Sequence, residues 1–222
     1  MDPRRIISIK LTLDKIREEA ENFRSEHIFT PDLPVDIEHI VESTMGIRII
    51  PVEGLQKHCD MEGFISKDYT SVYIDKFLYI EDRYYKRVRF TIAHEIGHYV
   101  LHRSTIDNQK FKDEEDWMKF RMGLNDEILG WFETQASEFA GRLLVPVDPL
   151  IVEFRSKREG VLKKYSSWDS KPLSDDDLFS MVAPMICGKF DVSADVIERR
   201  LRKENIIAIL ENKIRSAWTR AE

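Results

Sequence analysis

Two histidines and a glutamate within one short stretch could bind a metal ion and activate water. The stretch is RFTIAHEIGHYVLH (89–102), in which His94 and His98 are four positions apart and Glu95 follows the first histidine. Residues four apart on an α-helix share a face, with Cβ atoms about 5–6 Å apart, so both imidazoles can reach one ion. A catalytic zinc takes three protein ligands and keeps a position open for water. Glu95, at the edge of that face, is placed to take a proton from the water.

The rest of this helix indicates one buried side and one side that faces a cleft. Ile92, Ile96, Tyr99 and Val100 fall on the side away from the histidines, and such an apolar face predicts burial. Gly97 costs about 1 kcal/mol relative to alanine inside a helix. We therefore expect another element to approach closely beside the histidines.

His102 continues the histidine series, but its position argues against a ligand role. A regular helix places it a full turn, about 5.4 Å, beyond His98 along the axis. Metzincins reach a third histidine by breaking the helix at a glycine, and Leu101 occupies that position here. We interpret His102 as a structural residue or one that lies behind the ligands.

A third ligand is predicted from the segment ETQASEFAGRLLVP (133–146). Small residues form a stripe one and two helical turns beyond Glu133: Ala136, Ser137, Ala140 and Gly141. Such a stripe lets two helices approach closer than the usual 8–10 Å between axes, so Glu133 could reach a metal on the neighbouring helix. Other carboxylates on this helix are weaker candidates for the third ligand. Glu138 points away from the stripe of small residues. Asp126 and Glu127 lie near the helix start, where the helix dipole favours acidic residues anyway.

The elements that must position these groups begin with two helices and a small sheet. The apolar residues Ile9, Leu13, Ile16, Ala20 and Phe23 recur at helical spacing. A second helix directs Ile37, Ile40 and Val41 inward and ends at Gly46. Three segments rich in β-branched and aromatic residues predict strands over 47–52, 62–67 and 70–75.

Helices dominate the remainder of the predicted fold. A long helix over 82–102 contains the histidine motif, and the polar stretch 107–126 is expected to be an exposed connection. Asn125 is a fair N-cap for the helix that carries Glu133. We expect a short helix next, then a polar connector over 155–172, and two helices that begin at Ser174 and Ser193.

The predicted fold class is therefore α+β, a compact zincin-like domain. It combines a small three-stranded sheet, an active-site helix carrying H-E-x-x-H, a second ligand-bearing helix, and additional N- and C-terminal helices. The expected organisation is an N-terminal helix and linker over 1–33, the metallopeptidase domain over 34–146, and a C-terminal helical region over 147–222.

Composition narrows the function classes. Of the 222 residues, 42% are hydrophobic and 33% charged, and the formal net charge is −6. A surface that grips phosphates must be positive, so we expect no direct nucleic-acid binding. The two cysteines, Cys59 and Cys187, are far apart and indicate a reducing compartment rather than a disulfide framework. With no signal-peptide core and no apolar run of about 18 residues, we expect a soluble cytoplasmic protein without a membrane partner.

The two motif segments together resemble the ImmA/IrrE metallopeptidases. The pattern of that family is an H-E-x-x-H helix followed by a helix of the form E-x-x-A-N-x-F-A-x-x-L-L-x-P, to which RFTIAHEIGHYVLH and ETQASEFAGRLLVP are similar. The resemblance spans about 34–146 and extends more weakly through FDVSADVIERRL (190–201). Ser137 departs from the pattern, which usually has Asn there, and this bears on a local hydrogen bond rather than on the metal.

The resemblance implies one zinc ion per chain, held by His94, His98 and Glu133, with Glu95 as the catalytic glutamate. It also implies an intracellular protease of gluzincin type that cleaves helix-turn-helix repressors. Many members of the family carry their own helix-turn-helix domain, for which residues 1–33 are too few. DNA contact is therefore expected through the substrate, a partner protein.

Some alternatives stay open at this level. A competing function is an anti-repressor with a zincin fold that sequesters the repressor without proteolysis, although a structural metal site has no use for a base such as Glu95. The donor that stabilises the transition state could be Tyr69, Tyr73, Tyr84 or His102. If residues 70–75 form a sheet edge beside the cleft, an extended substrate could add to it as a strand.

Overall fold

The computed structural model describes residues 10–107, 115, 126–166 and 172–218. The chain forms two compact units, Met1–Leu144 and Val145–Glu222. Asn125, the predicted N-cap, and most of the predicted connection over 107–126 lie outside the described residues. As expected, the structure is mostly helical with one small mixed sheet, which is an α+β zincin-like arrangement.

The first unit opens with a capped amphipathic helix, α1 (Leu13–His27). The Oγ1 atom of Thr12 accepts a hydrogen bond from the backbone N–H of Lys15. The helix therefore begins where a threonine can cap a free N–H group of its first turn. Its predicted apolar positions Ile16, Ala20 and Phe23 are buried. A short helix α2 (Ile37–His39) and a π-helical turn η2 (Ile40–Thr44) follow and end before Gly46, which has φ of 70°.

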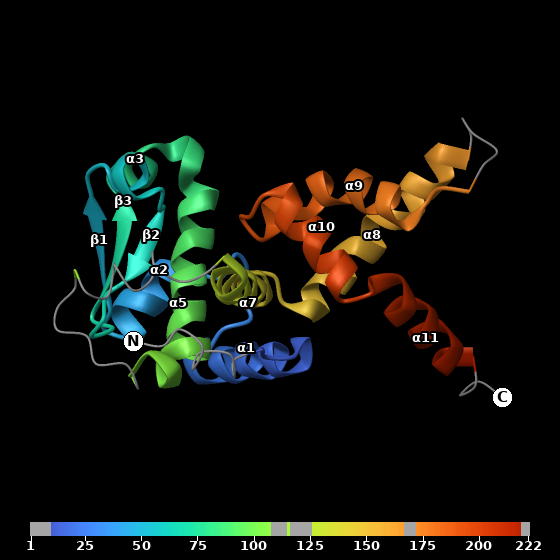
Figure 1. The fold of residues 1–222 in the computed structure, drawn as a ribbon. Helices are drawn as coiled ribbons and strands as arrows, with labels where there is room; N and C mark the ends of the chain where they lie inside the picture. The colour runs from blue at the N-terminus through green and yellow to red at the C-terminus, as the bar shows by residue number, and fades with distance from the viewer. Residues whose placement is uncertain (1–9, 108–114, 116–125, 167–171, 219–222) are drawn as a thin grey trace. The chain divides into compact units, whose positions relative to one another are not determined.

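The sheet has three strands in the order β1-β3-β2, as Figure 1 shows: β1 (Arg48–Val52), β2 (Gly63–Ile65) and β3 (Ser71–Asp75). β1 pairs with β3 in parallel, and β2 pairs with β3 antiparallel with Phe64 opposite Tyr73. The prediction that 70–75 could be a sheet edge is wrong, because β3 is the central strand and β2 is the edge beside the motif helix. Val72 and Ile74 are fully buried, as a central strand requires.

Two short helices that the sequence analysis did not predict flank the strands: α3 (Leu55–Cys59) after β1 and α4 (Lys76–Ile80) after β3. The carboxylate of Asp75 connects both. Its Oδ1 atom caps α4 by accepting from Phe77 N at 3.0 Å, and its Oδ2 atom accepts from Gln56 N at 2.9 Å. A single buried aspartate therefore ties α3 to the end of the central strand.

The two long helices of the first unit are α5 (Tyr85–Asp107), preceded by the 3₁₀ turn η3 (Asp82–Tyr84), and α7 (Asp126–Leu144). In Figure 1, α5 runs along the β2 side of the sheet. α1 packs against α7, where the rings of Phe23 and Phe139 meet edge to face at 5.7 Å. The Nη1 atom of Arg24 also donates to the carbonyl of Leu143 at 2.9 Å, so α1 holds α7 in place.

The second unit is helical: α8 (Val147–Ser166), α9 (Asp175–Ile186), the 3₁₀ turn η4 (Cys187–Lys189), α10 (Ala194–Lys203) and α11 (Ile206–Trp218). The predicted caps are present, since Ser174 accepts from Asp177 N at 3.2 Å and Ser193 from Val196 N at 3.3 Å. Inside this unit, Arg200 pairs with Glu204 at 2.6 Å, and both side chains are buried.

The prediction of a short helix followed by a polar connector over 155–172 is wrong, because α8 continues to Ser166. Only its first half buries large apolar side chains, those of Leu150, Ile151 and Phe154. The second half is rich in Lys, Arg and Glu, which are good helix formers that need no buried face. The polar composition of this second half is typical of a loop, but the segment forms a helix that is exposed to solvent. α11 was also not predicted.

Candidate metal centre

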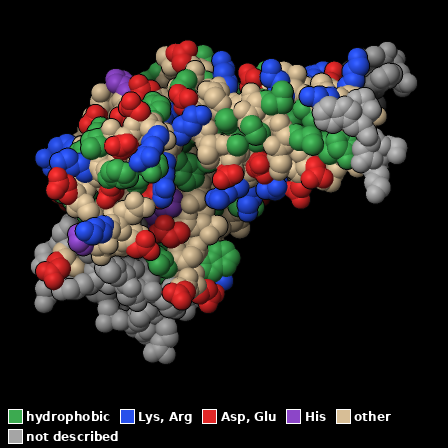
Figure 2. All heavy atoms as spheres, turned by 90° about the horizontal axis from the view of Figure 1, so that it is seen from above, with side chains coloured by type: hydrophobic (Ala, Val, Ile, Leu, Met, Phe, Trp, Pro, Cys, Tyr) green, Lys and Arg blue, Asp and Glu red, His purple; other side chains and the backbone are tan. Residues whose placement is uncertain are grey.

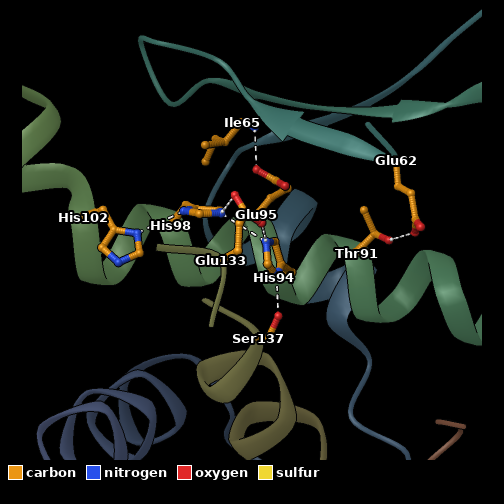
Figure 3. A network of polar contacts seen from close by, with 9 residues as sticks. All are labelled: Glu62, Ile65, Thr91, His94, Glu95, His98, His102, Glu133 and Ser137. Atoms are coloured by element: carbon orange, nitrogen blue, oxygen red, sulfur yellow. Dashed lines mark hydrogen bonds and ion pairs between the residues drawn. The ribbon is translucent and has the colours of Figure 1, made fainter. Parts of the chain in front are cut away.

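His94 and His98 present the same ring nitrogen to a common point on one face of α5 (Figure 3). Their Nε2 atoms lie 3.1 Å apart, and the ring centroids are 4.8 Å apart. The spacing of four residues produces this convergence, because one helical turn brings the second side chain above the first. His98 is buried and His94 is half-buried.

Glu133 reaches these two imidazoles from α7. Its Oε2 atom lies 2.9 Å from His94 Nε2, and its Oε1 atom lies 3.5 Å from His98 Nε2. Burial alone would raise the pKa of Glu133, but the hydrogen bonds and charges of His94 and His98 outweigh it and hold that pKa well below its ordinary range. The carboxylate is therefore ionised beside two imidazole nitrogens.

α7 approaches α5 closely at Gly97. This confirms the prediction that a glycine beside the histidines marks the close approach of another element. A Cβ atom at this position would lie 2.9 Å from the carbonyl oxygen and 3.0 Å from the Cα of Ala136. Only glycine leaves room for the backbone of α7 there. The glycine of one helix and the small residue of the other thus set the distance across which Glu133 meets the histidines.

Glu95 lies inside the same group and is held by the sheet. Its side chain is buried, and its Oε2 atom accepts a hydrogen bond from the backbone N–H of Ile65 on β2 at 2.9 Å. Donor atoms of His94, Glu95 and His98 lie within 4.8 Å of one another. The role of Ile65 could not be predicted from the sequence, because every residue type except proline carries a backbone N–H.

Both histidines also form hydrogen bonds on the side away from Glu133. The Nδ1 atom of His94 lies 3.2 Å from the hydroxyl oxygen of Ser137, and Nδ1 of His98 lies 3.0 Å from Nδ1 of His102. Ser137, the departure from the usual Asn, therefore still provides a partner at this position. His102 lies behind His98, as the sequence analysis expected, and is fully buried.

A cleft of about 570 Å³ opens onto these groups, and it is lined by residues 59–63, Phe90, Thr91 and Leu129 in addition to His94, Glu95 and Glu133. At its wall, Glu62 is an ion-pair partner of Arg87 and accepts from Thr91 Oγ1 at 3.1 Å. Burial would raise the pKa of Glu62, but Arg87 outweighs it and lowers that pKa.

None of the four proposed transition-state donors lines this cleft in the described part of the chain. Tyr69, Tyr73 and Tyr84 each pack against another aromatic ring, at centroid distances of 5.5, 4.7 and 5.7 Å respectively. Figure 3 shows His102 beyond His98, on the side away from His94. Glu138, the rival carboxylate, pairs with Arg142 at 2.8 Å instead.

The donor set fits a catalytic metal site. Two imidazole nitrogens and one carboxylate converge beside an open cleft, and three protein ligands with an accessible remaining position are what a catalytic zinc requires. A carboxylate that is not needed as a ligand, Glu95, lies next to them. This combination of helix motif, edge strand and second helix is typical of a zincin-like domain.

Comparison with known proteins assigns the chain to a family. A peptidase family model described as the IrrE N-terminal-like domain matches residues 43–202, and the chain belongs to this family. The match includes residues of both compact units. No curated protein matches the chain. Among the described residues, no helix is both long and apolar enough to cross a membrane.

Proposed function

We propose that this protein is a zinc-dependent endopeptidase and that its substrate is a helix-turn-helix transcriptional repressor. The observation that carries the peptidase assignment is the position of Glu95, buried next to two converging imidazoles and open to the cleft. The repressor as substrate rests on the resemblance to ImmA/IrrE proteins. In this proposal His94, His98 and Glu133 hold the ion.

Zinc bound by these residues would supply a Lewis acid that polarises a peptide carbonyl and acidifies water. The chain's own contribution is proton transfer by Glu95. Its carboxylate takes a proton from the attacking water and delivers it to the leaving amine. Glu95 therefore acts first as general base and then as general acid. The bond from Ile65 N to Oε2 fixes the orientation of that carboxylate.

The edge strand β2 is the element along which we expect an extended substrate to lie. It borders α5 and supplies Gly63 to the cleft wall, whereas β3 is enclosed by its two neighbours. Strand addition at a sheet edge provides backbone hydrogen bonds that are independent of side-chain sequence. Specificity would then come from side-chain contacts in the cleft.

Direct binding to DNA is not part of this proposal. Figure 2 shows Lys and Arg side chains interspersed with Asp and Glu on the face it presents, without a continuous basic surface among the described residues. A phosphate backbone would meet repulsion as well as attraction there.

Substitution of Glu95 by Gln tests the proposal. The amide keeps the shape of the side chain but cannot accept the proton, so cleavage should slow by about 10²–10⁴-fold. The assay incubates purified protein with purified candidate helix-turn-helix repressors and measures their cleavage by mass spectrometry. Zinc content should stay at one ion per chain. Glu159→Gln, an exposed change on α8, is the matched control.

The competing function predicts a different outcome of the same experiment. If the Glu95→Gln protein holds zinc, cleaves nothing and still relieves repression fully in cells, the protein acts by sequestration. Cleavage at the unaltered rate by Glu95→Gln would instead remove Glu95 from the mechanism.

A further inference from the structure

A chain of hydrogen bonds leads from His98 into the interior of the first unit. The Nδ1 atom of His98 lies 3.0 Å from Nδ1 of His102, and Nε2 of His102 lies 3.3 Å from the amide oxygen Oε1 of Gln135 on α7. All three side chains are buried, with exposed fractions of 5%, 0% and 3%. Figure 3 shows His102 on the far side of His98 from Glu133.

Metal binding determines which nitrogen of His98 must lack a proton. Its Nε2 atom faces His94 and Glu133, so this nitrogen must be unprotonated to bind a metal. A neutral imidazole then carries its hydrogen on Nδ1, which donates to Nδ1 of His102. His102 in turn carries its hydrogen on Nε2 and donates it to Gln135. Each contact in the chain then joins one donor and one acceptor.

The opposite arrangement of hydrogens fails at the far end of the chain. If His102 donated from Nδ1, its unprotonated Nε2 would face the amide oxygen of Gln135. Two acceptors would then be opposed in a buried place, where unsatisfied polar groups are costly. The ring of His102 is also packed against Phe132 with centroids 4.3 Å apart, which restrains reorientation.

We propose that His102 and Gln135 are positioning residues that fix the tautomer of His98 required for metal binding. This inference rests on the proposed metal site. His98 differs in this respect from His94, whose Nδ1 partner is the hydroxyl of Ser137. A hydroxyl both donates and accepts, so it accommodates either tautomer of His94. The amide oxygen of Gln135 only accepts and therefore enforces one.

Two substitutions at His102, Asn and Leu, are nearly isosteric with each other. They separate a role of His102 in positioning His98 from a role in packing. Asn places its Oδ1 atom near the position of His Nδ1 and can still accept from His98, whereas Leu cannot. The zinc affinity of each purified protein is measured by competition with a chromophoric chelator. We expect His102→Leu to bind zinc about 10–100-fold more weakly and His102→Asn to stay within a few-fold of the unaltered protein.

Gln135→Met provides a test that leaves both histidines in place. It removes the acceptor at the end of the chain, so zinc binding should weaken by about 10-fold, within the range found for partners of metal ligands. Far-UV circular dichroism of the zinc-free proteins checks that each variant is folded. If His102→Leu does not fold, the inference is tested by Gln135→Met and by magnetic resonance spectra of the unaltered protein.

The tautomers can be read directly from ¹⁵N–¹H spectra of the zinc-loaded, unaltered protein. Hydrogens on Nδ1 of His98 and Nε2 of His102 are expected. A hydrogen on Nδ1 of His102, or unaltered zinc affinity of folded His102→Leu and Gln135→Met, would overturn the inference even if the protein cleaves its substrate. Conversely, correct tautomers and weakened variants in a protein that holds zinc but cleaves nothing would sink only the proposed function.

Discussion

The helices α5 and α7 contribute to the same centre in different ways. α5 carries His94, Glu95 and His98 within five consecutive residues, so their mutual geometry follows from the helix itself. α7 carries Glu133, which meets the histidines only because the two helices come close at Gly97. The arrangement on α5 therefore needs only a helix, whereas the approach of Glu133 depends on tertiary packing.

The packing on which Glu133 depends involves a third helix. α1 contacts α7 through Phe23 and Arg24, while α5 meets α7 at Gly97. α7 is thus held by two helices within the first unit. The contribution of α7 to the site should therefore be more sensitive to distant substitutions than that of α5.

The largest effect that separates the two helices is expected at Glu133 itself. Glu133→Gln removes the proposed anionic ligand and should weaken zinc binding by more than 100-fold, about 2.8 kcal/mol, because a ligand matters more than its hydrogen-bonding partners. The measurement is chelator competition. Glu138→Gln, five residues further along α7, should leave the affinity within a few-fold. Equal losses from both substitutions would contradict the assignment of Glu133.

A smaller effect is expected from closing the gap between the helices. Gly97→Ala places a methyl group against the backbone of Ala136, so the helices must separate. Overpacking of this kind costs about 1–3 kcal/mol in unfolding free energy, which is measured by urea denaturation. Zinc affinity should fall as well, although no ligand is altered.

Gly160 in α8 provides the control for that substitution. A Cβ atom at Gly160 would meet nothing within 4 Å, so Gly160→Ala should stabilise the protein by up to about 1 kcal/mol through helix propensity alone. If Gly97→Ala stabilises the protein to the same extent, the contact between α5 and α7 is looser than the structure describes.

The smallest loss of zinc affinity is expected at Ser137. Ser137→Ala removes the partner of His94 Nδ1, and we expect about a 10-fold loss of zinc affinity, or about 1.4 kcal/mol. Ser137→Asn, which restores the usual residue of the family pattern, should retain the affinity because its side-chain oxygen also accepts. A loss with Asn equal to that with Ala would mean that the shape of serine, rather than its hydrogen bond, matters here.

Several elements followed from the sequence because their signals are local. The caps at Ser174 and Ser193 require only a side-chain oxygen near a backbone N–H two or three residues on. The strands were placed within one or two residues by their β-branched content. α8 was misjudged because a solvated helix needs no apolar period, and the order of the strands was not predictable because β2 and β3 carry similar apolar signals.

The sequence by itself determined the pair His94 and His98, the neighbouring Glu95 and the need for a close contact at Gly97, because helical periodicity links spacing directly to direction. Tertiary structure alone decided that the hydrogen bond to Glu95 comes from Ile65, and that His102 connects His98 to Gln135. These contacts join residues 30 or more positions apart in sequence or depend on ring orientation. Such contacts are set by how elements pack, and no single segment encodes that packing.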